Sequence, residues 1–533
     1  MTNTKELVED TSWGSFSSAG LWNIEQERAE QYSIENQARR AQVNQYAYEL
    51  LNPKRIPPLT RLFVPLARVL SAVALWYCFD KRRGKEKSRE GISRKLRKRF
   101  VKLGSAYIKL GQIISSGENL FPSQLVDEFK LLRDQVPPEP YHDIVQLIEE
   151  ELGRPLESVF SYFEREPLAA ASIAQVHNAR LITGETVVVK VQRPKVKNLV
   201  HKDIAALAWL APRAVGRIPI TALANPPALV ELFSETICEE LDFRLEADNM
   251  LCLARVLAKT KQRSIIVPRP YLDIVTERVL VMEKMDGYGF DDVDSMKNAG
   301  IDTKELLHSG LIAFMEGALL HGLFHGDLHG GNLFVQPDGK TALMDFGITG
   351  RFNEQRRKAF MRIIIAGTSG NIKQQVIALR DLGAFPQDVD IDQVIRDLDL
   401  EGPVKDPTKM SSEQLTAELS QVAKKLLGYG AHAPKELMLF VKNLVFLDGA
   451  TARLAPDIDI LEEINQVYMY FVQTYGAQIV AELGISDQEL KEFDTEAVLN
   501  SMGIEEPRET LTYQDVLKRR EIIKKRMANK END

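Results

Sequence analysis

The sequence predicts an α+β fold in which a lobe of sheet and helix is followed by a mainly helical lobe, with further helices in front of both. Residues 156–192 alternate short apolar runs with turn residues such as Thr183-Gly184, which predicts strands and a hairpin. A helical pattern over 228–260 separates them from two more strands within 265–287. After Gly287 the apolar spacing is mainly helical to about residue 475, which predicts the second lobe.

Bulk composition limits the possible classes of protein. The 533 residues include 44% hydrophobic and 27% charged residues, as in globular proteins with two or three domains. A net charge of -7 argues against a general nucleic-acid binder. The three cysteines are scattered and show neither disulfide-framework nor zinc spacing.

The N-terminal region, residues 1–60, reads as a polar helical arm that ends near Pro53. Its first residues, MTNTKELVEDTSWGSF, lack the order of a secretory signal and the Arg-rich, acid-poor bias of a transit peptide. We therefore expect a cytoplasmic protein.

The next region, residues 61–152, begins with an apolar stretch from Leu62 to Phe79 that meets a dense basic run. The stretch has about the minimum length of a spanning helix but contains Pro65 and Arg68, so an interfacial helix on anionic lipid is the better membrane interpretation. A core helix followed by a solvated basic face is the alternative. Residues 96–152 predict helices broken at Pro122 and at Pro137-Pro138.

The lobe predicted over 153–286 contains Lys190 in the apolar run TVVVK, where an ammonium could neutralise nucleotide phosphates. Its anionic partner is expected on the helical segment CEELDFRLEAD. That segment offers Glu239, Glu240, Asp242 and Glu246, of which we favour Glu246 for the ion pair. A solvated acidic helix face is the alternative for all four.

The lobe predicted over 287–475 contains FHGDLHGGNLFVQPDGKTALMDFG, residues 324–347, ahead of a charged tail over 476–533. Phosphoryl transfer from a nucleotide requires a carboxylate near the acceptor and groups that hold bridging Mg²⁺ ions. Asp327 is the candidate catalytic carboxylate, and Asn332 and Asp345 are the candidate Mg²⁺ ligands. The turn Pro337-Asp338-Gly339 is expected to fold the two intervening strands into a hairpin that brings the metal ligands together.

The two histidines of this stretch, His325 and His329, are expected to pack or to orient substrate. Upstream, the nucleotide loop is predicted over Ala169, Ala170, Ala171 and Ser172. Alanine restricts positive φ and close backbone approach, both of which glycine permits. The loop should therefore be stiffer than a glycine-rich loop.

Four separated motifs make the chain resemble the UbiB (AarF) family of atypical protein-kinase-like proteins over roughly residues 95–400. These motifs are KLGQ at 109–112, AAAS at 169–172, EELD with Glu246 beyond it, and HGDLHGGN followed by DFG. The resemblance implies a protein-kinase-like two-lobed fold with an N-terminal helical extension laid over the site of a peptide substrate. It also implies that Lys109 and Gln112 reach the active site, and we place Glu283 and Met285 at the nucleotide.

The resemblance further implies a Mg²⁺-dependent, ATP-binding atypical kinase or ATPase that supports isoprenoid-quinone or prenyl-lipid metabolism at a membrane. The expected partners are ATP, an anionic membrane surface or prenyl lipid, and proteins of a biosynthetic complex, with no nucleic acid. The expected location is cytoplasmic and peripheral to a membrane, in a bacterium, with a cyanobacterium as one candidate source. A small-molecule kinase of the aminoglycoside or choline type and a nucleotide-binding pseudokinase scaffold remain alternatives.

Overall fold

The computed structural model describes most of the chain and divides it into two compact units. The described residues are 16–17, 20–22, 24–53, 56–115, 122–132, 137–214, 226–402, 405–411, 414–415, 418, 421–422, 425–426, 428–431, 434–504 and 510–529. Unit 1 comprises residues 1–255, 267–286 and 344–348, and unit 2 comprises 256–266, 287–343 and 349–533.

Unit 1 contains an antiparallel sheet in the order β3-β5-β6-β8, with β4 paired to β5. Its strands are β3 (Phe160–Phe163), β4 (Ala169–Ala170), β5 (Ala174–Leu181), β6 (Thr186–Gln192) and β8 (Val279–Glu283). The predicted hairpin is confirmed as β5-β6, and Gly184 in its turn has φ +105°, which glycine adopts without steric cost.

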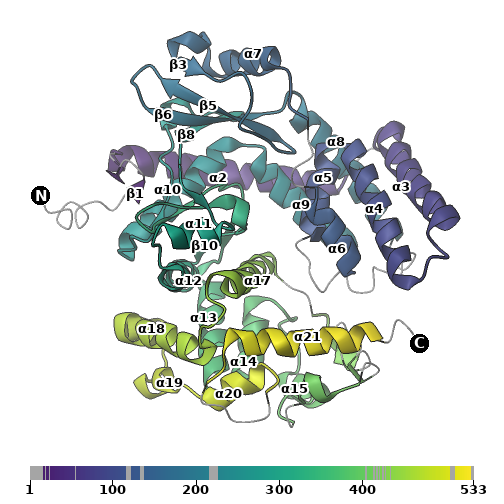
Figure 1. Ribbon diagram of the computed structural model, residues 1–533, viewed down its shortest axis with the longest axis vertical. Helices are drawn as coiled ribbons and strands as arrows, with labels where there is room; N and C mark the ends of the chain where they lie inside the picture. The colour runs from purple at the N-terminus through teal and green to yellow at the C-terminus, as the bar shows by residue number, and fades with distance from the viewer. Residues whose placement is uncertain are drawn as a thin grey trace, which may run out of the picture. The chain divides into compact units, whose positions relative to one another are not determined.

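The sheet buries one face against α7 (Tyr141–Leu152), as Figure 1 shows. On β6, Val187, Val189 and Val191 alternate along the strand and are fully buried. They pack in one cluster with Ile144 and Ile148 of α7. This alternation leaves the side chain of Lys190 on the opposite face of the sheet.

Both predicted breaks are present, because α6 begins directly after Pro122 and Pro137-Pro138 lie in the non-helical stretch 137–140 that precedes α7. The long helical segment is divided in two, with Leu241 and Asp242 between α9 and α10. Besides α7, the unit contains α2 (Gln26–Leu51), α3 (Leu59–Phe79), α4 (Lys85–Leu103), α5 (Ser105–Ser115), α6 (Ser123–Lys130), α8 (Val196–Ala214), α9 (Pro226–Glu240), α10 (Phe243–Lys259), the short strands β1 (Phe16–Ser17) and β2 (Gly20–Leu21), and the 3₁₀ turns η1 (Leu156–Ser158) and η3 (Leu272–Ile274).

Helix α3 is not the buried core helix of the alternative interpretation. It packs against α4 and α8, yet only Leu62, Pro65 and Ala72 of its 21 residues are buried. By length and composition it could cross a membrane, and 17% of its most apolar window is buried. Its exposed apolar side chains include Leu59, Phe63, Leu66, Leu70, Val73 and Tyr77. This spacing of three and four residues places them in one stripe along the helix.

Unit 2 contains a sheet in the order β7-β12-β11-β9 and a separate pair β10-β13. The strands are β7 (Ile265–Ile266), β9 (Tyr288–Gly289), β10 (Leu323–His325), β11 (Leu333–Val335), β12 (Thr341–Leu343) and β13 (Thr349–Arg351). The predicted hairpin over 333–343 is confirmed by the antiparallel register of β11 and β12, and Gly339 in its turn has φ +84°.

The helices of unit 2 surround an aromatic core in which Phe314, Phe324, Phe360 and Phe440 make ring contacts at 4.5–5.7 Å. They are α11 (Val293–Asn298), α12 (Thr303–Leu320), α13 (Glu354–Thr368), α14 (Ile372–Leu382), α15 (Ile391–Leu398), α17 (Lys435–Leu454), α18 (Ile460–Leu483), α19 (Asp487–Lys491), α20 (Thr495–Ser501) and α21 (Tyr513–Asn529), with the 3₁₀ turns η4 (Gly330–Asn332) and η5 (Pro407–Lys409).

Two of the predicted segment boundaries differ from the structure. The boundary between residues 475 and 476 falls inside α18, because the apolar spacing of that helix continues to Leu483. Beyond it, Val498, Leu499 and Leu511 pack with Leu461 of α18, so the charged tail contributes to a hydrophobic core. Strand β7 pairs with β12 of unit 2 and not with the sheet of unit 1.

Candidate functional site

The predicted ion pair between Lys190 and Glu246 is present in unit 1. Lys190 Nζ lies 2.7 Å from Glu246 Oε1 and 3.1 Å from Asp345 Oδ1. The side chains of Lys190 and Glu246 are 12% and 3% exposed, whereas that of Asp345 is 49% exposed. The lysine therefore lies between a buried carboxylate on α10 and an accessible one.

Burial and neighbouring charges shift the pKa values of Lys190 and Glu246 in opposite directions. Burial by itself would lower the pKa of Lys190, but the charges of Asp345 and Glu246 outweigh it and raise that pKa above its usual range. Burial raises the pKa of Glu246 to about 7, although the charge of Lys190 opposes the shift. The lysine thus stays charged, and its charge favours the ionised form of the buried carboxyl without cancelling the effect of burial.

Asp345 has an unusual backbone conformation with φ +57°. Few residues other than glycine adopt this region, and the surrounding structure must hold them in it. Asp345 Oδ1 accepts the amide of Gly347 at 3.4 Å, and the carbonyl of the fully buried Phe346 accepts Asn249 Nδ2 at 2.8 Å. The Asp-Phe-Gly segment is therefore fixed to α10.

The predicted residues of the K-x-G-Q signature lie on one helix, α5, and Lys109 contacts the acidic junction between α9 and α10. Lys109 Nζ is 2.7 Å from Glu240 Oε1, and both side chains are nearly buried. Burial raises the pKa of Glu240, and the charge of Lys109 opposes that shift. Gly111 is required for packing, since a Cβ there would lie 2.3 Å from Leu132 Cδ1. Glu240 therefore faces the helix that carries the K-x-G-Q signature.

The alanine-rich loop is held in a tight turn at the edge of the sheet. Ala169 pairs with Val176, and the amide of Ala171 donates to the carbonyl of Ala174 at 2.8 Å. Arg193 Nε donates to the carbonyl of Ala171 at 2.9 Å, and Ser172 is buried. This backbone pairing leaves the loop little freedom.

Glu283 and Met285 lie at the end of β8 and just beyond it, and both are buried. The backbone amide of Glu283 donates to the carbonyl of Arg269 at 2.9 Å, and Glu283 Oε2 accepts the amide of Arg269 at 3.3 Å. Their contact with a nucleotide stays a prediction.

The predicted catalytic loop lies in unit 2, between β10 and β11. Asn332 Nδ2 donates to the carbonyl of Asp327 at 3.0 Å, and the amide of Asp327 donates to Nδ1 of the buried His325 at 3.2 Å. His329 Nδ1 accepts the amide of Gly331 at 3.1 Å. Both histidines thus support the loop backbone, and a substrate-orienting role for them stays a prediction.

Two residues that contact this loop were not predicted from the sequence. Both lie beyond about residue 400, where no motif indicated any chemistry. Helix α17 places Lys442 in an ion pair with Asp327 Oδ1. The adjacent Asn443, fully buried, donates to the carbonyl of His325 and accepts the amide of Leu328 at 3.1 Å. The polar pair Lys442-Asn443 inside the apolar run LMLFVKNLVF is the feature that could have drawn attention to these residues.

The structure therefore groups Lys190, Glu246 and Asp345 in unit 1, and Asp327 and Asn332 in unit 2. Within the described ranges, no group of three or more His, Cys, Asp or Glu side chains is arranged to hold a metal ion. The oxygens of Asp345 and Asn332 are nonetheless the hard donors that Mg²⁺ prefers. The hydrogen bond of Asn332 Nδ2 to the carbonyl of Asp327 uses the amide nitrogen and not the amide oxygen.

Comparison with known proteins identifies the family. The ABC1 atypical kinase-like domain matches residues 131–378. A protein of Mycobacterium tuberculosis described as uncharacterized protein Rv0647c is 35% identical over 383 residues, which cover 68% of this chain and 75% of the relative. The probable protein kinase UbiB of Pseudomonas aeruginosa is 34% identical over 377 residues, which cover 69% of each chain.

Among solved structures, the complex of Rv3197 with erythromycin from Mycobacterium tuberculosis aligns with a TM-score of 0.37 and 20% identity, over 65% of this chain and 91% of that chain. The matched domain and the two relatives confirm the predicted family. Together with the described elements, they also confirm the predicted α+β, kinase-like fold with preceding helices. The chain belongs to the ABC1/UbiB family of atypical kinase-like proteins.

Proposed function

We propose that the protein binds ATP with Mg²⁺ and hydrolyses it or transfers its γ-phosphoryl group. Kinase-like family membership implies ATP binding. The observation that carries the proposal is the group of Lys190, Glu246 and Asp345 within one unit, with a buried pair and an accessible carboxylate. Such a group presents one cation to phosphates and one oxygen ligand to a metal.

The roles of the chain's own residues follow from their contacts. Glu246 pairs with Lys190, which would supply positive charge to the α- and β-phosphates of bound ATP. Asp327 would orient the attacking hydroxyl or water. Asp345 and Asn332 would hold Mg²⁺, which supplies positive charge to the phosphates when bound. Lys442 and Asn443 fix Asp327 and its loop on α17.

Calorimetry of ATP binding tests this proposal. We expect saturable binding of ATP at millimolar Mg²⁺ and weaker binding in EDTA, since Mg²⁺ held by Asp345 would supply positive charge to the phosphates. Failure to detect adenine nucleotide binding with either Mg²⁺ or Mn²⁺ would contradict it. Binding without Mg²⁺-dependent turnover would favour the pseudokinase scaffold, and rapid transfer to a small hydroxyl compound would favour a small-molecule kinase.

The membrane part of the proposal is supported by α3 and α4. The apolar stripe of α3 is exposed, and the neighbouring α4 has basic side chains exposed at Lys87, Arg94, Lys98 and Lys102. These positions are seven, four and four residues apart, which places them on one face of the helix. An apolar helix beside a basic one is suited to the interface of an anionic bilayer.

Flotation with liposomes tests this surface. Changing Arg94, Lys98 and Lys102 to Gln is expected to weaken binding to anionic liposomes by about 100-fold, since each basic residue near such a surface contributes about 1 kcal/mol. Lys95 and Arg97 stay unchanged because they pair with Asp80 and Glu128. Changing the exposed Lys518, Lys524 and Lys525 of α21 to Gln removes equal charge and is the control. Equal binding by both variants would contradict the proposal.

The biological setting is proposed from the family resemblance alone. It comprises support of isoprenoid-quinone or prenyl-lipid metabolism, association with proteins of a biosynthetic complex, and a cytoplasmic, membrane-peripheral location in a bacterium. Comparison of quinone content in cells with and without the gene tests the pathway, and unchanged prenyl-lipid levels would contradict it.

A further inference from the structure

The N-terminal helix α2, for which the sequence indicated no function, inserts an arginine into the acidic face of the nucleotide-binding unit. Arg40 is 14% exposed and lies 3.3 Å from Glu239 Oε2 and 3.2 Å from Asp248 Oδ2. Its guanidinium also donates to Asn249 Oδ1 at 2.9 Å. Asp248 and Asn249 are almost fully buried, so these contacts form inside the protein.

Asn249 connects this arginine to the candidate metal-binding segment. Its Oδ1 faces Arg40, and its Nδ2 donates to the carbonyl of Phe346 at 2.8 Å. Phe346 directly follows Asp345, whose φ of +57° requires support from its surroundings. One buried amide thus lies between α2 and the backbone of the Asp-Phe-Gly segment.

The chemistry of the guanidinium fixes the direction of this amide. Arginine only donates hydrogen bonds, so the amide oxygen of Asn249 must face Arg40. The amide nitrogen must then face the carbonyl of Phe346, which only accepts. A rotated amide would place donor against donor and acceptor against acceptor, and Arg40 therefore selects the orientation that supports Phe346.

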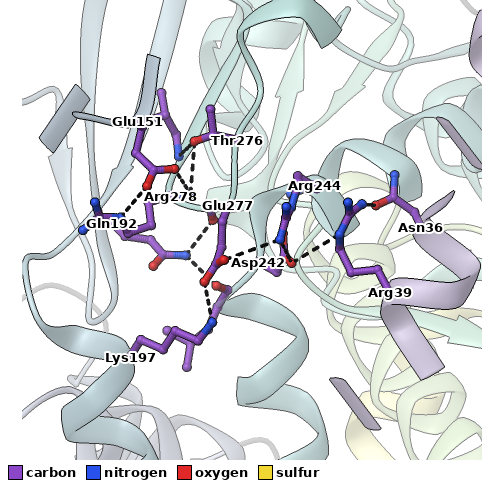
Figure 2. A network of polar contacts seen from close by, with 12 residues as sticks. Asn36, Arg39, Glu151, Gln192, Lys197, Asp242, Arg244, Thr276, Glu277 and Arg278 are labelled. Atoms are coloured by element: carbon purple, nitrogen blue, oxygen red, sulfur yellow. Dashed lines mark hydrogen bonds and ion pairs between the residues drawn. The ribbon is translucent and has the colours of Figure 1, made fainter. Parts of the chain in front are cut away.

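A second set of contacts fixes the same helix to the junction between α9 and α10. Figure 2 shows Arg39 of α2 between Asn36 of the same helix and Asp242. Arg39 Nε lies 3.9 Å from Asp242 Oδ2, and Asp242 accepts Arg244 Nη2 at 2.6 Å. The network continues from Arg244 to Glu277 and on to Gln192, at the end of the strand that contains Lys190. Ser33 adds a hydrogen bond to Asp248 Oδ1 at 2.9 Å.

We propose that α2 positions the metal ligand Asp345, with Arg40 acting through Asn249 on the carbonyl of Phe346. Arg40 is a positioning residue that touches neither nucleotide nor metal, and its effect on Mg²⁺ rests on the function proposed above. A partner or modification that displaced α2 would weaken the metal site while leaving Lys190 and Glu246 in place. Helix α2 would therefore regulate turnover.

The test compares two arginines of the same helix. Arg40→Met removes the buried contacts, whereas Arg28→Met removes an exposed pair with Asp273 and is the matched control. In the nucleotide-free protein, hydrogen exchange of residues 344–348 is expected to be about tenfold faster in Arg40→Met than in wild type and unchanged in Arg28→Met. Equal exchange in both variants would overturn the proposal, and this result does not depend on ATP binding.

Metal affinity provides the second readout. In the ATP-loaded protein, Arg40→Met is expected to weaken Mg²⁺ binding about 10- to 100-fold, because the loss of groups that orient metal ligands has effects of this size. The affinity for ATP measured in EDTA is expected to stay within about twofold of wild type. Parallel losses of Mg²⁺ affinity and of ATP affinity in EDTA would indicate general destabilisation and overturn the proposal. Absence of ATP binding by the wild type would instead contradict the proposed function and leave the exchange test decisive.

A second variant keeps the test sharp if Arg40→Met does not fold. Asn249→Leu has similar size, preserves the ion pairs of Arg40 with Glu239 and Asp248, and removes the bond to Phe346. We expect it to raise exchange at residues 344–348 as Arg40→Met does. The double variant should then be no more affected than the more affected single variant, because both act through one contact. Additive effects would contradict the connection through Asn249.

Discussion

Replacement of Asp345 by asparagine is expected to lower Mg²⁺-dependent ATP hydrolysis about 1000-fold, since a metal ion stabilises transition-state charge by several kcal/mol and each 1.4 kcal/mol is a factor of ten. Asparagine has the same shape and tolerates the left-handed backbone at this position, so the fold should be kept. It lacks the negative charge that the metal and Lys190 require. Steady-state hydrolysis at saturating ATP over a range of Mg²⁺ concentrations measures the effect.

Asp338→Asn is the matched control for this prediction. Asp338 lies in the turn of the hairpin of β11 and β12, is half exposed and pairs with Lys340. We expect hydrolysis by this variant to equal that of wild type within about twofold, as for most exposed ion pairs. Equal hydrolysis by Asp345→Asn and wild type would show that Asp345 holds no catalytic metal.

Replacement of Lys190 by methionine is expected to remove nucleotide binding and to destabilise unit 1 in a pH-dependent way. Breaking a buried pair from one side costs about 3–5 kcal/mol when the remaining charge is kept. Glu246 has its pKa raised to about 7 by burial even beside Lys190, and loss of the lysine removes the interaction that opposes this rise. The buried carboxyl of the variant is therefore protonated below neutral pH.

The sign of the pH dependence follows from proton binding. A carboxyl whose folded pKa lies above its unfolded value of 4.5 binds more protons in the folded state, so stability falls as pH rises from about 4.5 through the folded pKa. For Lys190→Met we expect a loss of about 3 kcal/mol at pH 8.5 and less than half of that at pH 5.5. Urea denaturation at both pH values measures it.

Two further variants separate this effect from other causes. In Lys190→Met/Glu246→Gln the buried group cannot ionise, so the extra loss at high pH should disappear. Lys373→Met breaks an exposed pair with Asp392 and should leave the stability nearly unchanged at either pH, because solvent screens exposed pairs. The same pH dependence in the single and double variants would show that Glu246 is not the titrating group.

The sequence by itself determined the elements and contacts that depend on local pattern. The apolar run Val187–Val189 specified β6, and Glu246 on the following helical segment was correctly favoured as the partner of Lys190. The turn residues of 337–339 specified the hairpin of β11 and β12. Proline and glycine marked the ends of helices, because they restrict or release the backbone locally.

The tertiary structure alone decided which distant polar side chains meet. Arg40 and Asn249 are 209 residues apart, and Lys442 and Asp327 are 115 apart. No periodicity records such pairs, since a buried polar side chain is stabilised by whichever partner the packing of several elements brings to it. The exposure of the apolar stripe of α3 was also decided by the tertiary structure. An apolar helix has the same sequence pattern whether its stripe is buried in a core or exposed. The packing of α4 and α8 against α3 leaves its stripe uncovered.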